Sequence, residues 1–192
     1  MTVGSAGSLS PRRADTRRNH ERILAVAAEN LSASGEVSFN AIAKLAGVGV
    51  GTVYRHFPTP ADLILAVYER EVRHLVDVVP ELLERGDPAE AFRTWATDHL
   101  APYMMTKCGL AKALAAVTAQ RGTLPASAVQ AIHGAMDALL RANAEAGLVR
   151  PGLHADTVMR SLLGLFYLDP DGDWQRQTAE LVDLVWRGIR AA

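Results

Sequence analysis

Apolar residues recur at intervals of three and four along most of the chain, with polar residues at the positions between them. This spacing places the apolar side chains on one face of an α-helix, whereas a half-buried strand would alternate at every second residue. The sequence shows neither such an alternation nor an internal repeat. The pattern therefore predicts an all-α protein of about nine helices.

Three of these helices are predicted close together near the N-terminus. The first covers about residues 16–33, with Ile23 and Leu31 on one face and Gly35 placed to end it. Residues 38–57, SFNAIAKLAGVGVGTVYRHF, then read as two short helices joined by a turn that contains glycine. Two helices joined in this way form a helix-turn-helix, whose second helix enters the major groove of DNA.

The residues of this stretch fit the ends and faces of both helices. Ser38 can cap the first helix by accepting from a free backbone N–H, and Gly47 stands where a left-handed residue would end it. In the second helix, the side chains predicted to point inward are Val50, Val53 and Phe57. The side chains predicted to lie outside, where they can meet phosphates and base edges, are Thr52, Tyr54, Arg55 and His56.

A long helix is predicted to connect this unit to the rest of the chain. Thr59, Pro60 and Asp62 supply an N-cap, a proline at the first helical position and an acidic residue at the third. The helix is expected over residues 60–85. Pro80 is expected to kink or end it, because proline removes a backbone donor and clashes with the preceding turn.

The rest of the chain is predicted to form further helices. One begins after Asp87 and carries Trp95 and Tyr103, with a kink at Pro102. The apolar stripes of the last two helices are too wide for one small core. The helices after the kink are expected over about residues 110–119, 125–146, 155–168 and 173–190.

Charge divides the chain into a small basic part and a larger acidic one. Of its 192 residues, 49% are hydrophobic and 21% charged, which is ordinary for a globular protein. The net charge is −1, but residues 1–60 hold seven Arg/Lys against four Asp/Glu, a balance of +3 that leaves −4 for the remainder. This asymmetry favours a DNA-facing part joined to an acidic body. The predicted divisions are a disordered basic arm over 1–15, a helix-turn-helix domain over 16–59, and a larger helical domain over 60–192.

Several other classes of protein are disfavoured. Cys108 is the only cysteine, which excludes an internal disulfide framework and a Cys-based zinc site. No apolar run approaches the roughly 18 residues of a membrane span, and the first residues lack the order of a secretion signal. The glycines of residues 47–51 follow a predicted helix, whereas a dinucleotide-binding fingerprint must follow a strand, so a nucleotide site is disfavoured there. Residues 169–180 match the ligand positions of a calcium-binding loop only out of register, so a calcium site is disfavoured as well. We therefore predict a cytoplasmic protein with no cofactor, no metal site and no membrane partner.

The stretch IAKLAGVGVGTVYRHFPTPADLILAV resembles the TetR family of bacterial transcriptional regulators, and the resemblance covers roughly Thr16 to Val67. It implies an N-terminal DNA-binding domain and a connecting helix that transmits an effector signal by shifting this domain. It also implies a homodimer in which the last two helices form a four-helix bundle with their copies.

The resemblance also assigns DNA contacts. It implies that Thr52, Tyr54 and His56 touch the DNA backbone, while Val50 and Arg55 lie nearer to base edges. Arginines beside a helix-turn-helix can reach phosphates or the minor groove, although a solvated tail is an equal alternative. The other predicted DNA-binding residues are Arg17, Arg18, Ser38 and Gly51.

Two positions depart from the family pattern. The family usually has Ser or Thr where Gly49 stands, and usually has Lys, which meets a phosphate, where Pro60 stands. A glycine cap costs only a few tenths of a kcal/mol of helix stability. A missing lysine lowers by about one the number of counterions that DNA binding releases, and so lowers the salt dependence of binding. These departures support a second hypothesis, in which the helix-turn-helix is degenerate and the chain is a helical interaction or ligand-sequestering protein.

Aromatic, histidine and methionine side chains of the body could line a small-molecule pocket, because such sites are mainly apolar with a few polar anchors. Trp95, His99 and Tyr103 follow one another at intervals of four and so form one stripe along their helix. Aromatic and methionine side chains at helical spacing also form plain core, and both interpretations stay open. The candidate ligand-binding residues are Trp95, His99, Tyr103, His133, Met136 and Phe166.

The sequence favours a homodimeric transcriptional regulator, a repressor whose two DNA-binding domains hold a near-palindromic operator until a small molecule changes their separation. Its predicted partners are double-stranded operator DNA, a small-molecule effector and a second copy of the chain through the last two helices. A small all-α enzyme would be a third hypothesis. No nucleophile, base and orienting group come together in a motif, so we predict that the protein is not an enzyme.

Overall fold

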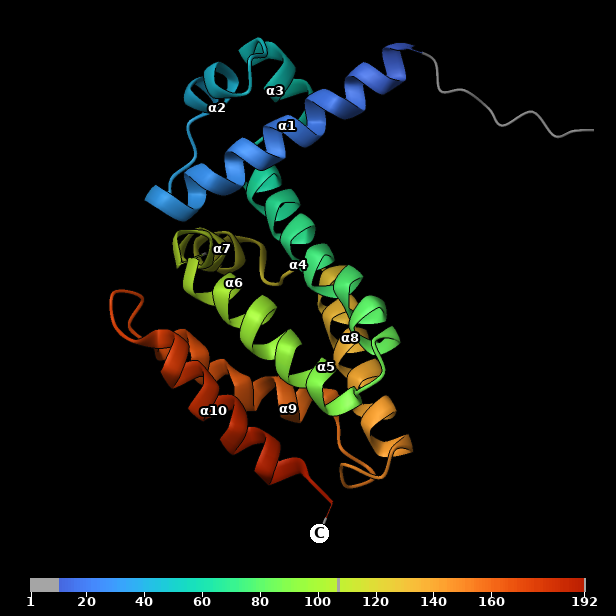
Figure 1. The fold of residues 1–192 in the computed structure, drawn as a ribbon. Helices are drawn as coiled ribbons and strands as arrows, with labels where there is room; N and C mark the ends of the chain where they lie inside the picture. The colour runs from blue at the N-terminus through green and yellow to red at the C-terminus, as the bar shows by residue number, and fades with distance from the viewer. Residues whose placement is uncertain (1–10, 107, 192) are drawn as a thin grey trace, which may run out of the picture.

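The computed structural model describes residues 11–106 and 108–191, most of which are helical (Figure 1). Within these residues the β-type pairing is a single isolated bridge between Val149 and Arg190. The predicted all-α class is confirmed, and the described part holds nine helices when each uninterrupted run is counted once. In chain order the helices are α1 (Pro11–Ser34), α2 (Phe39–Leu45), α3 (Val50–His56), α4 (Pro60–Glu84), α5 (Pro88–Thr94), the π-helix η1 (Trp95–Leu100), α6 (Ala101–Thr106), α7 (Cys108–Arg121), α8 (Ala126–Glu145), α9 (Ala155–Leu162), the 3-10 helix η2 (Leu163–Tyr167) and α10 (Trp174–Ile189).

The helices α1, α2 and α3 form a small head in which α1 crosses the other two (Figure 1). α1 begins at Pro11, a first helical position that suits proline. Positions 11–15 of the predicted disordered arm are therefore helical, and residues 1–10 lie outside the described residues. The buried residues of the head include Ile23, Leu31, Ile42, Val53 and Phe57, and they belong to one hydrophobic cluster that continues into the body.

The helix α4 runs from the head into the body (Figure 1). Thr59 Oγ1 accepts from the N–H of Asp62 at 3.2 Å and the Asp62 carboxylate accepts from the N–H of Thr59 at 3.0 Å, so the predicted helix start is a complete capping box. The helix continues through Pro80 to Glu84, so Pro80 does not end it. Pro80 lies on the exposed side, where solvent can satisfy the carbonyl that it leaves without a donor.

The helical run after Asp87 is continuous from α5 through η1 to α6, but its winding changes on the way. In η1 the N–H of Ala101 donates to the carbonyl of Ala96, five residues back. Pro102 follows and has no N–H to donate, so a wider turn before it relieves the clash between its ring and that turn. The interruption predicted at Pro102 therefore takes the form of a π-helical segment.

In the body, the run from α5 to α6 lies between α4 on one side and α9, η2 and α10 on the other (Figure 1). The helix α8 packs along α4, and Phe92 and Trp95 are fully buried. The last four predicted helices agree with α7, α8, the α9–η2 run and α10 to within two residues at each end. None of the helices in the described residues is long and apolar enough to cross a membrane.

Candidate DNA-binding surface and ligand cavity

The turn between α2 and α3 has the geometry that its glycine predicts. Gly47 has a φ of 63°, in the left-handed region that favours glycine. The N–H of Val48 donates to the carbonyl of Ala43 at 3.0 Å and closes the end of α2. At the other end, Ser38 accepts from the N–H of Ala41 at 3.4 Å, so the Ser38 hydroxyl serves as the helix cap.

The helix α3 is anchored by Val53, which is fully buried, and by Phe57 just after it, which is 3% exposed. Val50, predicted to point inward, is 40% exposed instead. It is the first residue of α3, beyond the part of the helix that the core covers. This exposure is compatible with the base-edge position predicted for Val50, because an apolar side chain can contact the methyl group of thymine.

The polar side chains of α3 are partly held by contacts within the head. Arg55 folds back along the helix, where its Nε donates to the carbonyl of Gly51 at 3.2 Å and its Nη2 to Thr52 Oγ1 at 3.1 Å. Tyr54 is 54% exposed, and its ring packs edge-on against Phe39 with 4.8 Å between the ring centroids. Side chains restricted in this way lose less conformational freedom when a partner binds.

His56 lies in a cluster of rings at the end of α3. The centroids of the His56 and His20 rings are 5.3 Å apart, and His20 stacks on Phe57 at 5.0 Å. Burial lowers the pKa of His56, and the charges of His20 and Arg55 lower it further. His56 is therefore neutral at neutral pH and keeps one ring N–H with which it can donate to a phosphate.

The helix α1 adds a second row of side chains to this surface. A hollow of about 310 Å³ is lined by Thr16, Arg17, His20 and His56. Arg17 thus lies beside α3, whereas Arg18 makes an exposed ion pair with Asp15. His20 is absent from the predicted contacts, although its position three residues after Arg17 places both on one face of the helix.

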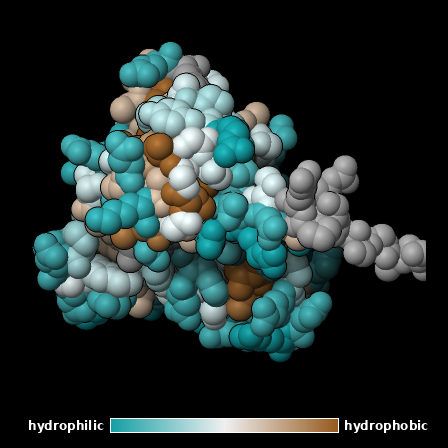
Figure 2. All heavy atoms as spheres, turned by 90° about the horizontal axis from the view of Figure 1, so that it is seen from above, coloured by the Kyte–Doolittle hydropathy of each residue, from teal (hydrophilic) through white to brown (hydrophobic). Residues whose placement is uncertain are grey.

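Hydrophilic side chains cover most of the molecule on the side of the head (Figure 2). The large aliphatic residues of α2 and α3 that reach the surface are Leu45, which is 67% exposed, and Val50. Arg17, Lys44 and Arg55 are exposed in the head. A polar, basic surface with isolated apolar groups is typical of protein–DNA interfaces.

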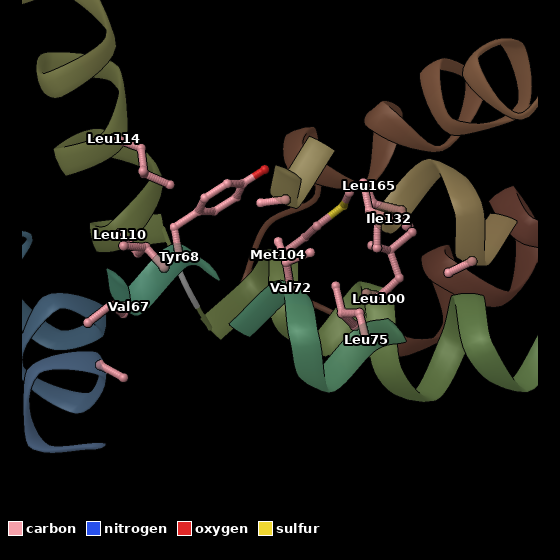
Figure 3. Packing of buried hydrophobic residues seen from close by; sticks show 14 of the residues in the cluster. Val67, Tyr68, Val72, Leu75, Leu100, Met104, Leu110, Leu114, Ile132 and Leu165 are labelled. Carbon is pink, nitrogen blue, oxygen red and sulfur yellow. The ribbon is translucent and has the colours of Figure 1, made fainter. Parts of the chain in front are cut away.

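The body contains a cavity of about 660 Å³, which lies within the usual range for small-molecule sites. Tyr68 and Val72 of α4 line it together with Leu114 of α7. Figure 3 shows the ring of Tyr68 projecting from α4 toward the space between Leu114 and Met104. The other walls include residues of α6, α8 and η2.

Two of the six predicted ligand residues line this cavity, Tyr103 of α6 and Phe166 of η2. Trp95 and Met136 do not line it, and both are fully buried in the core. The indole Nε1 of Trp95 donates to the carbonyl of Leu75 at 2.8 Å inside that core.

His99 and His133 are half-buried and also lie outside the cavity wall. The predicted stripe of Trp95, His99 and Tyr103 assumes regular helical spacing, which does not hold across the π-helix η1. Tyr68 is absent from the prediction. The sequence feature that could have identified Tyr68 is its position one turn before Val72 on the apolar face of α4.

Two tyrosine hydroxyls supply free polar groups in the cavity wall. Burial raises the pKa of Tyr68. Burial, with smaller electrostatic contributions from the neighbouring Tyr68 and Glu71, raises the pKa of Tyr103, so both hydroxyls remain protonated. Neither makes a hydrogen bond to another of the described residues. Thr118 also lines the cavity, but its hydroxyl donates to the carbonyl of Leu114 at 2.7 Å.

A second surface, formed by η2 and α10, exposes several large apolar side chains. Tyr167 is 90% and Leu184 is 71% exposed, and Leu163 and Phe166 are exposed to 44% and 45%. Exposed apolar residues that gather on one side of a molecule mark candidate interaction surfaces.

Comparisons with known proteins match the head and the body in turn. Residues 23–67 match the family described as bacterial regulatory proteins, tetR family, and residues 87–191 match the SbtR-like transcriptional regulator C-terminal domain. An HTH-type transcriptional regulator of Staphylococcus aureus (strain USA300) is 39% identical over 62 residues, which are 31% of this chain and only 34% of that protein.

Solved structures extend the similarity to nearly the whole chain. A TetR transcriptional regulator from Streptomyces coelicolor is 38% identical with a TM-score of 0.73, over 90% of this chain and 99% of that one. A TetR transcription regulatory protein from Mycobacterium vanbaalenii is 32% identical with a TM-score of 0.71, over 94% of this chain and 100% of that one. The chain belongs to the TetR family of bacterial transcriptional regulators.

Proposed function

We propose that the protein is a ligand-responsive repressor that binds a near-palindromic operator as a homodimer and is released by a small-molecule effector. The observation that carries this proposal is that α1 of the head packs against both α4 and α7, each of which lines the cavity. A ligand that displaces either helix would therefore move the head. The free energy needed to shift operator binding is small. A tenfold preference of the ligand for the dimer whose heads do not match the spacing of the operator half-sites corresponds to about 1.4 kcal/mol.

The proposed dimer uses the apolar surface of η2 and α10. Joining two copies there would bury Tyr167 and Leu184, which are mostly exposed in the single chain. The two α3 helices would then enter major grooves about one helical turn or more apart. The proposal places the protein in the cytoplasm and assigns it no enzyme activity and no cofactor.

Alanine variants of α3 are expected to weaken DNA binding in two distinguishable ways. Arg55→Ala should relax base preference at one position, by about 1–3 kcal/mol of discrimination, because it removes the charged side chain nearest to base edges. Tyr54→Ala and His56→Ala should weaken binding to all sequences alike, because they remove contacts to the DNA backbone. Fluorescence anisotropy with a duplex from the region upstream of the protein's own gene, its single-base variants and an unrelated duplex measures both effects.

Arg85→Ala is the matched control, because Arg85 is an exposed arginine after the far end of α4, paired with Glu81 at 2.7 Å. It should bind DNA like the wild type. Unchanged binding in the Arg55, Tyr54 and His56 variants would refute the assigned contacts. Wild-type binding that survives excess unrelated DNA and weakens as salt rises supports a regulator, whereas no specific binding favours the degenerate helix-turn-helix.

Leu184→Glu is expected to shift the protein from dimer to monomer. Leu184 is exposed on α10, so the change costs the single chain little, whereas a dimer would bury a carboxylate among apolar side chains. Sedimentation equilibrium measures the mass. Leu45→Glu, at a leucine of similar exposure in the head, should leave the dimer intact; a Leu184→Glu variant that stays dimeric would place the interface elsewhere.

A further inference from the structure

The walls of the cavity select a chemical class of ligand. We infer that the cavity binds a neutral, mainly apolar molecule that presents a hydrogen-bond acceptor, such as a ketone, ester or ether oxygen, to Tyr68 and Tyr103. This inference rests on the proposed function, because it names the class of effector for the cavity assigned there.

The described walls of the cavity offer no partner to a charged ligand. Among the described residues that line it, none is Asp, Glu, Lys, Arg or His. An ion that enters an apolar site without a partner loses its hydration and gains little in return. The acid next to this wall, Glu71, is not a lining residue, and its carboxylate lies 3.4 Å from Arg70 Nη1. The wall therefore favours neutral ligands.

The polar groups that remain are hydroxyls, each of which has a hydrogen to donate. The hydroxyls of Tyr68 and Tyr103 have no hydrogen bond to another described residue, while the Thr118 hydroxyl is already bonded to the carbonyl of Leu114. A ligand oxygen that accepts from the tyrosines would satisfy donors that a pure hydrocarbon would leave without a ligand partner. Both tyrosines come from the walls formed by α4 and α6, so the acceptor belongs at that side of the ligand.

Small side chains on α7 make room for the apolar part of the ligand. Ala111, Ala115 and Ala119 lie four residues apart on one face of the helix, and all three line the cavity. Ala115 and Ala119 are also exposed, so the cavity reaches the surface beside this helix. A bulky side chain at Ala115 would therefore fill space that the ligand needs.

Three probes with ten carbon atoms each test the charge of the ligand: 2-decanone, decanoate and decylammonium. Their binding to the full chain is measured without DNA, by displacement of the fluorescent N-phenyl-1-naphthylamine. We expect 2-decanone to bind at least about tenfold more tightly than either ion, because only the ions must be desolvated without a partner. Decanoate or decylammonium that binds as tightly as the ketone would overturn the neutral class.

Two pairs of variants test the assigned groups and the location. The double variant Tyr68→Phe, Tyr103→Phe should bind 2-decanone about tenfold more weakly while it still binds the naphthylamine probe, because it removes only the two donors. Ala115→Phe should abolish binding of both molecules, whereas Ala116→Phe, at an exposed neighbour outside the cavity, should not. Unchanged ketone affinity in the double variant would overturn the role of the donors. Equal binding by the two phenylalanine variants of α7 would overturn the location.

A separate measurement distinguishes this inference from the proposed function. Operator affinity is measured by anisotropy with and without 2-decanone. Binding of the ketone with no change in operator affinity would refute an effector role for this class of ligand and leave the ligand class of the cavity intact. Tight binding of the ions would refute the class and leave DNA binding by the head untouched.

Discussion

Replacing Gly109 with alanine is expected to push the head away from the body where α1 packs on α7, and to lower operator affinity by about tenfold, or 1.4 kcal/mol. A Cβ atom at Gly109 would lie 1.9 Å from the carbonyl oxygen of Leu31 and 2.9 Å from the nitrogen of Gly35, whereas real Cβ contacts stay beyond 3.0 Å. The atoms in the way are backbone atoms, which cannot turn aside as a long side chain can. The helices α1 and α7 must move apart, and overpacking of this kind costs about 1–3 kcal/mol of stability.

The position of this contact explains why its effect should reach DNA binding. Gly109 is at the start of α7, whose later turns line the cavity, and Leu31 is in the last turns of α1. A shift there changes the orientation of α3 relative to the body, and in a dimer it changes the spacing of the two heads. The resemblance assigned transmission of the signal to α4; the contact at Gly109 supports α7 as a second route.

The change at Gly134 provides the matched control. Gly134 lies inside α8, and a Cβ atom there would meet nothing within 4 Å. Gly134→Ala should therefore leave operator affinity unchanged and stabilise the protein by up to about 1 kcal/mol, because alanine is the better helix former. Urea denaturation followed by circular dichroism measures stability, and anisotropy measures DNA binding. If Gly109→Ala behaves like Gly134→Ala in both measurements, the contact does not join the cavity to the head.

The elements of the head could be predicted because the interactions that define them are local. Ser38 bonds to a residue three positions away, Gly47 needs only its own left-handed backbone, and Thr59 and Asp62 cap each other across one turn. Each of these devices spans a few residues and leaves a recognisable spacing in the sequence. The exposure of Val50 could not be read in this way, because it depends on how far the core of the head extends along α3.

The cavity could be predicted only in part, because its walls come from five separate segments of the chain. Tyr103 and Phe166 have the right chemistry in the sequence, but so does Trp95, and only packing distinguishes a residue of the wall from one of the core. The π-helical winding of η1 also changes which residues share a face, and regular periodicity does not reveal it. Gly35 could be predicted as a helix end, whereas its close approach to Gly109 depends on the docking of two distant helices.

Replacing Trp95 with alanine is expected to be among the most destabilising single changes in the body, with a loss of about 3–5 kcal/mol in the free energy of unfolding. Trp95 is fully buried, and its Nε1 donates to the carbonyl of Leu75 in α4 at 2.8 Å. The variant therefore loses a large packed ring and a hydrogen bond between η1 and α4. Trp95→Phe keeps most of the ring and should lose about 1 kcal/mol, the contribution of one such bond.

The phenylalanine variant also decides between the two interpretations of Trp95, as core or as ligand contact. If Trp95 acts only in the core, Trp95→Phe should bind 2-decanone as the wild type does while it unfolds at lower urea concentration. Trp174→Ala is the control, because Trp174 at the start of α10 is only half-buried and should lose less stability than Trp95→Ala. All variants are compared at one protein concentration, since dimerisation couples stability to concentration. Weakened ketone binding in Trp95→Phe at unchanged stability would assign Trp95 to the ligand site. A residue that acts only in the core affects the cavity through packing, so its replacement would change stability as well.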